Sequence, residues 1–125
     1  MQRTTGQYTA AHACQQRALE LYRTLGARDG AAEALNGMGD LALAQASATA
    51  DDALYWYDQA LALARDVNVP LEAARALEGI GQCQLQNGHP NQAGPNLREA
   101  LAIYQRLRSP FAQRVQATIQ EHQLT

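Results

Sequence analysis

The sequence predicts an all-α fold, an α-α superhelix in which helical hairpins stack side by side as a solenoid. Three observations lead to this prediction: the composition, an internal repeat and the spacing of apolar residues. Alanine, with 25 copies, and glutamine, with 15, dominate the 125 residues, and both favour helices. Residues with β-branched side chains are sparse and scattered, so strands are not expected. A chain of this length fits one domain, residues 1–125.

An internal repeat divides the chain into two kinds of segment. Residues 31–43 align with residues 73–85 at an offset of 42, and seven of the thirteen positions are identical; we call this kind of segment A. A second kind, B, repeats out of phase with the first. Residues 53–62 match residues 93–102 at an offset of 40, and residues 11–25 carry the same pattern. The chain therefore alternates B and A segments.

Apolar residues recur at helical spacing within each segment. In the middle B segment they form one stripe of Ala53, Tyr57, Ala60, Leu61 and Ala64. The A segments each carry a comparable stripe, although the last one is weaker. The predicted helices, in the order B, A, B, A, B, A, cover residues 7–25, 29–46, 51–67, 70–87, 91–108 and 110–123.

Turn residues separate these helices. Gly26 interrupts the chain before the first A helix, and Pro70 suits the first turn of the second. Gly88 begins a tight turn that ends at Asn91, which is expected to be the N-cap of the last B helix. Pro110 marks the end of that helix.

Glycines inside the A helices call for a physical reason, because glycine in a helix costs about 1 kcal/mol relative to alanine. Gly39 and Gly81 stand at equivalent places in the two repeats. We expect a neighbouring helix to pack too closely there for a Cβ atom. The alanines Ala18, Ala60 and Ala100 of the B helices are interpreted in the same way.

These residues resemble the signature of the tetratricopeptide repeat (TPR): a large apolar residue four positions before a glycine in helix A, then alanines seven apart in helix B. The matching positions are Leu35, Gly39, Ala53, Tyr57 and Ala60, followed by Leu77, Gly81, Gly88, Ala93, Leu97 and Ala100. The repeat length of 40–42 is similar to a long variant found in bacterial transcriptional activators of the antibiotic-regulator type. The resemblance implies a protein–protein interaction module, which could be the regulatory or sensor part of such a regulator.

The resemblance also implies where another protein or peptide would bind, because the A helices of this family line a concave groove. Carried over one position at a time, the groove residues are Glu33, Asn36, Asp40, Leu43, Arg75, Glu78, Gln82, Leu85 and Arg114. Repeated polar side chains on a helix face can hydrogen-bond an extended peptide. For any single residue the alternative is an ordinary solvated helix face. The family's clamp for a C-terminal carboxylate is not matched, so a ligand of that kind is disfavoured.

Composition and spacing argue against several other functions. A net charge of −2 disfavours nucleic acid as a partner. No apolar stretch approaches the length of a membrane span and no signal core follows the N-terminus, which predicts a cytoplasmic protein without membrane partners. Cys14 and Cys83 lie far apart without a Cys/His cluster, so no metal site is expected. No catalytic constellation or cofactor motif is present, and the chain is predicted not to be an enzyme.

Three alternatives stay open beside the interaction module. The first B helix has no A helix before it, so the protein could form a homo-oligomer through its N-terminal helix as a structural protein. A closed pocket between the A helices would instead favour a small-molecule-binding accessory protein in a biosynthetic pathway. RNA binding requires a basic groove, against which Glu33, Asp40 and Glu78 argue. Trp56 is expected either to contact the preceding hairpin or to form an exposed anchor for a partner.

Overall fold

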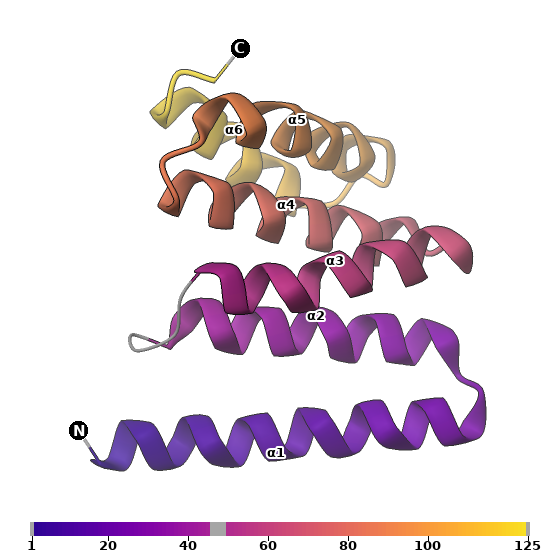
Figure 1. Ribbon diagram of the computed structural model, residues 1–125. Helices are drawn as coiled ribbons and strands as arrows, with labels where there is room; N and C mark the ends of the chain where they lie inside the picture. Colours follow the sequence, from indigo (N-terminus) through magenta and orange to yellow (C-terminus); the bar gives the residue numbers. More distant parts are fainter. Residues whose placement is uncertain (1, 46–49, 125) are drawn as a thin grey trace.

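The computed structural model of the chain describes residues 2–45 and 50–124. Within these ranges the secondary structure consists of helices without strands, which confirms the predicted fold class. Consecutive helices pack against each other and reverse direction at each short loop, so the chain forms a layered stack in a helical-repeat arrangement (Figure 1). The helices are α1 (Gln2–Leu25), α2 (Arg28–Ala44), α3 (Ala50–Asp66), α4 (Pro70–Gln86), α5 (Pro90–Arg106) and α6 (Phe111–Glu121).

The predicted helix boundaries are wrong by a few residues at several ends. Helix α1 begins at Gln2 rather than residue 7, because adding a residue to an existing helix gains a hydrogen bond even where no apolar stripe is present. Helix α2 ends at Ala44, where Gln45 is already extended, and the predicted end at residue 46 lies outside the described residues. Asn91 is not the N-cap of α5, since the helix already begins at Pro90.

A shared backbone motif explains where most helices end. A residue with positive φ follows each of α1, α3, α4, α5 and α6, and these residues are Gly26, Asn68, Gly88, Arg108 and Gln123. The next amide then bonds back to a carbonyl five residues earlier, as Val69 does to Ala64 at 2.8 Å and His89 does to Gln84 at 2.8 Å. This is the Schellman arrangement, which satisfies carbonyls that the helix end would leave unpaired.

Glycine and alanine allow the helices to approach as the sequence predicted. A Cβ atom built on Gly39 would lie 2.6 Å from the ring of Tyr57, and one built on Gly81 would lie 2.6 Å from Leu97. The Tyr57 ring also touches Gly79, where an added Cβ would collide with it. The ring of this α3 residue therefore lies between α2 and α4 in space that two glycines leave open.

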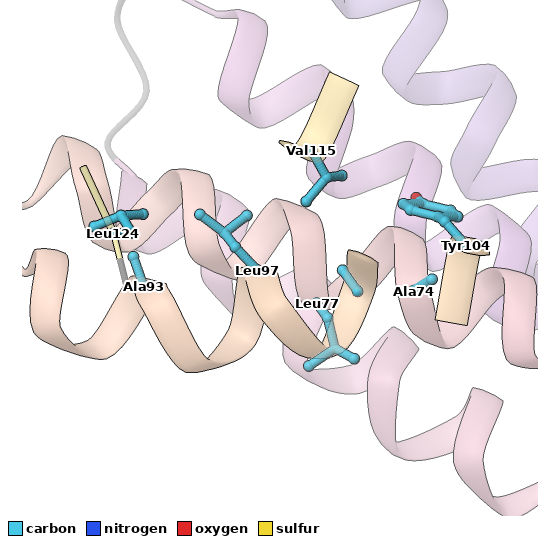
Figure 2. Packing of buried hydrophobic residues seen from close by; sticks show 8 residues of the cluster. Ala74, Leu77, Ala93, Leu97, Tyr104, Val115 and Leu124 are labelled. Carbon is cyan, nitrogen blue, oxygen red and sulfur yellow. The ribbon is translucent and has the colours of Figure 1, made fainter. Parts of the chain in front are cut away.

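The buried residues form clusters between neighbouring helices. One cluster joins α4, α5 and α6 through Leu77, Leu97 and Val115, as Figure 2 shows. Another joins α1, α2, α3 and α4, with Leu19, Ala60 and Ala76 among its members, and Trp56 packs partly buried against it. The partial burial of Trp56 agrees with the expected contact to the preceding hairpin, while its neighbour Tyr55 is exposed.

The two ends of the stack differ in their exposed surfaces. On α1, Leu21 and Leu25 are 57% and 69% exposed. On the outer side of α6 most exposed side chains are polar, including Gln113, Gln116 and Gln120, and the small Ala117 lies among them. In the part of the chain that the structure describes, no helix has the length and apolarity that crossing a membrane requires.

Candidate binding groove

Helices α2, α4 and α6 present side chains to one groove of about 550 Å³, with a contribution from α3. Seven of the nine residues that the sequence assigned to a binding surface line it: Glu33, Asp40, Leu43, Arg75, Glu78, Gln82 and Arg114. The remaining lining residues are Tyr57, Leu71, Glu72, Gly79 and Phe111. The groove thus combines charged, amide and apolar groups.

The first charged network of the groove joins α2, α3 and α4. The Tyr57 hydroxyl donates a hydrogen bond to the Asp40 carboxylate at 2.5 Å. The Arg75 guanidinium donates to Asp40 at 2.9 Å and to Glu72 at 3.0 Å. Because Arg75 bridges a carboxylate on each A helix, it holds α2 and α4 in a fixed relation.

Asn36 does not line the groove, contrary to the prediction from the sequence. It is buried and hydrogen-bonded to Glu72, a member of the first charged network. Its side chain is fully buried, and its amide group donates to the backbone carbonyl and to the carboxylate of Glu72, both at 2.9 Å. The side-chain oxygen of Asn36 has no hydrogen-bond partner, alone among the buried side-chain polar atoms of the described residues. Because Asn36 lies on α2 and Glu72 on α4, these hydrogen bonds tie the two helices together.

The second charged network joins α4, α5 and α6. The Tyr104 hydroxyl donates to Glu78 at 2.9 Å, and Arg114 donates to both oxygens of the same carboxylate at 2.6 and 2.7 Å. The Arg114 guanidinium also lies 4.4 Å from the centre of the Phe111 ring. Phe111 in turn makes an edge contact with the Tyr104 ring, with centroids 5.7 Å apart.

Both networks follow one scheme. In each network an acidic residue of one A helix (α2 or α4) accepts a hydrogen bond from a tyrosine of the next B helix (α3 or α5). The same acidic residue forms an ion pair with an arginine of the next A helix (α4 or α6). The sets are Asp40, Tyr57 and Arg75, then Glu78, Tyr104 and Arg114. The residues are not spaced equally along the two repeats, and for that reason the period of 40–42 does not predict the scheme.

The networks alter the acidity of their members. Burial, and then the hydrogen bond to Asp40, raise the pKa of Tyr57 well above its usual value. Burial and the charge of Glu78 likewise raise the pKa of Tyr104. Burial alone would lower the pKa of Arg75, but the carboxylates of Glu72 and Asp40 outweigh it and the pKa rises. The tyrosines are therefore fixed hydrogen-bond donors rather than candidate bases.

Leu85 is the second residue whose predicted place was wrong. It does not line the groove, because it packs against the cluster of α4, α5 and α6. Sequence reasoning in turn missed Leu71 and Phe111, each 39% exposed in the groove. Both lie in the first turn of an A helix, where the repeat alignment is weak.

A second hollow lies on the outer side of the stack. It has a volume of about 820 Å³ and is lined by α1, α2 and α3 through Tyr22, Ala31, Leu35, Ala62 and Leu63, among others. It is an open trough, whereas the sequence-based alternative required a closed pocket between the A helices. Across residues 2–45 and 50–124 no three His, Cys, Asp or Glu side chains are grouped so as to hold a metal ion.

No protein-family model matches the sequence, and no curated protein is similar to it.

Proposed function

We propose that this protein is a TPR-like interaction module whose groove between α2, α4 and α6 holds an extended segment of another protein. One observation supports this most: seven of the residues that the TPR resemblance implied as groove residues line one concave surface. They come from three helices that are far apart in the sequence. The long-repeat resemblance makes a regulatory part of a transcriptional regulator the context that we propose.

The chemistry of the groove suits a peptide better than a reaction. Gln82 offers an amide that can both donate to and accept from a peptide backbone. Leu71 and Phe111 offer apolar surface that a partner side chain can cover. Arg75, Arg114 and the carboxylates that they contact are already held by ion pairs, so binding needs little further ordering of these side chains. The tyrosines and carboxylates serve as fixed contacts, and we propose no catalytic role for them.

A selection from a random peptide library tests this function. Immobilised protein is expected to enrich a set of related peptides. The variant Gln82→Trp, which places a large side chain on the central helix of the groove, is expected to lose that enrichment. Gln116→Trp is the matched control, since Gln116 is exposed on the outer side of α6. Equal enrichment by all three proteins would show that the peptides bind elsewhere.

Self-association is the second candidate, and the exposed Leu21 and Leu25 on α1 favour it. Helix α1 contacts a helix on one side only, whereas α3 lies between α2 and α4. Sedimentation equilibrium over a hundredfold range of concentration tests this candidate. A mass that stays monomeric excludes it, and a dimer that Leu21→Ser/Leu25→Ser dissociates supports it.

A further inference from the structure

We infer that the segment held in the groove is cationic, with a lysine or arginine beside an apolar side chain. This inference rests on the proposed function, since it names the chemistry of the partner at the same groove. It follows from the balance of charge among the lining residues and from which of those charges are already paired.

The lining residues carry an excess of negative charge. Four of them are carboxylates (Glu33, Asp40, Glu72 and Glu78) and two are guanidiniums (Arg75 and Arg114). Four negative and two positive groups leave a formal charge of −2 in the groove. A concave surface lined by one sign of excess charge attracts ligands of the opposite sign.

Both guanidinium groups of the groove are already paired with carboxylates. Arg114 donates to both oxygens of Glu78, whose side chain is only 11% exposed. Arg75 donates to Asp40 and to the buried Glu72. An acidic ligand would meet these carboxylates beside the guanidiniums, and displacing either pair would leave a buried carboxylate without its partner, which is strongly unfavourable.

Negative charge, in contrast, remains available to a ligand. Glu33 is exposed at the groove. Asp40 keeps a 57% exposed side chain while it accepts from Tyr57 and Arg75. A carboxylate has about four acceptor sites, so an ammonium or guanidinium group can bind Asp40 without displacing either donor.

Apolar groups in the same groove define the second element of the ligand. Leu71 and Phe111 line it and are partly exposed, while Leu43 lines it and is half-buried. A segment with only basic residues would leave this surface uncovered. A segment that carries a basic residue beside an apolar one can satisfy both the carboxylates and the apolar surface.

The selected peptides themselves provide the first test. Peptides enriched by the wild-type protein are expected to carry more lysine and arginine than the starting library. The best of them is then synthesised together with a twin in which each Lys and Arg is replaced by Gln. Fluorescence anisotropy with the labelled peptides measures the affinities, and the basic peptide is expected to bind roughly tenfold or more tightly than its neutral twin.

Two protein variants test whether Glu33 is the carboxylate that favours the basic peptide. Glu33→Gln is expected to weaken binding of the basic peptide roughly threefold to tenfold and to leave the neutral twin unchanged. Glu20→Gln removes the same charge from exposed α1 and is expected to have no effect. Raising the salt concentration from about 50 to about 500 mM is expected to weaken binding of the basic peptide, because salt screens exposed charges.

The outcomes separate this inference from the proposed function. Enriched peptides that are neutral or acidic, or a neutral twin that binds equally well, would overturn the cationic ligand while the groove remains a peptide site. An equal loss for Glu33→Gln and Glu20→Gln would also overturn it. No enrichment by the wild-type protein over Gln82→Trp would reject the groove as a peptide site and the inference with it.

Discussion

The ring of Tyr57 shows how single residues set the distance between helices. It occupies the space that Gly39 and Gly79 leave between α2 and α4, and its hydroxyl reaches Asp40 at the groove. The same side chain therefore fills the core and positions a charged group at the candidate site. The two glycines permit this contact, although each lowers the intrinsic stability of its helix.

A substitution at Gly79 tests this contact. In an open helix Gly→Ala stabilises by about 1 kcal/mol, but here the new Cβ would collide with the Tyr57 ring. Gly79→Ala is expected to lower the free energy of unfolding by about 1–3 kcal/mol in urea denaturation. The matched control is Gly94→Ala, where the nearest atom is the flexible end of Arg98 at 3.1 Å. A stabilised Gly79→Ala would contradict the packing described.

A buried thiol and two buried tyrosine hydroxyls predict that the protein loses stability at alkaline pH. Burial raises the pKa of the Cys83 thiol to about 11, and the pKa values of Tyr57 and Tyr104 are raised as well. A group whose pKa is higher in the folded protein stabilises it fully below the unfolded pKa, and this contribution is lost as pH rises. The melting temperature is therefore expected to fall between about pH 9 and pH 11.

The variant Cys83→Ala separates the thiol from the tyrosines in this pH profile. Its melting temperature is expected to fall less steeply over the same range, because only the tyrosines then contribute. A melting temperature that is constant from about pH 9 to about pH 11 in the wild-type protein would contradict the burial of these groups.

The position of a single residue could be predicted from the sequence only where its residue type indicates which part of the structure it contacts. The repeat identified Gly39 and Gly81 as close contacts, because glycine inside a helix lowers its stability unless a neighbour needs the space. It misplaced Asn36, since its burial depends on the stagger between α2 and α4, which no period in the sequence records. A polar residue at a repeat position was thus not enough to separate a helix tie from a groove contact.

At the scale of elements, ion pairs connect one A helix to the next. Arg75 joins α4 to α2, and Arg114 joins α6 to α4. Because each pair joins the A helices of two successive repeats, it holds one repeat against the next. The helices themselves were predicted well from apolar periodicity, whereas their ends were not. The positive φ values of Asn68 and Arg108 end α3 and α5, and neither residue type indicates such a conformation as glycine does.

A double-mutant cycle measures how much these pairs contribute. The pair Glu78–Arg114 is partly buried, and the cycle with Glu78→Gln and Arg114→Gln is expected to give a coupling of about 1–2 kcal/mol. The comparison pair Arg65–Glu99 also joins two helices, but both side chains are half-exposed. Its coupling is expected to stay below about 0.5 kcal/mol. Equal couplings would show that the groove pair is only a surface contact.

At the scale of the whole molecule, the helices are stacked in chain order, and the two ends of the stack expose different surfaces. Helices α3 and α4 pack between neighbours on both sides, whereas α1 has a neighbour on one side and exposes leucines. The outer side of α6 is mostly polar. The sequence predicted the array because it follows from the order of the segments. The outer trough between α1 and α3 depends on how far the helices separate, so no motif predicted it.

Amide hydrogen exchange with and without the tightest peptide from the selection tests the central claim most directly. The account predicts added protection in α2, α4 and α6, in the turns that carry Glu33, Asp40, Gln82 and Arg114. Gln116→Trp should show the same pattern, because its substitution lies outside the groove. Added protection confined to α1 and α3, around the outer trough, would contradict the claim that alternate helices form the binding surface.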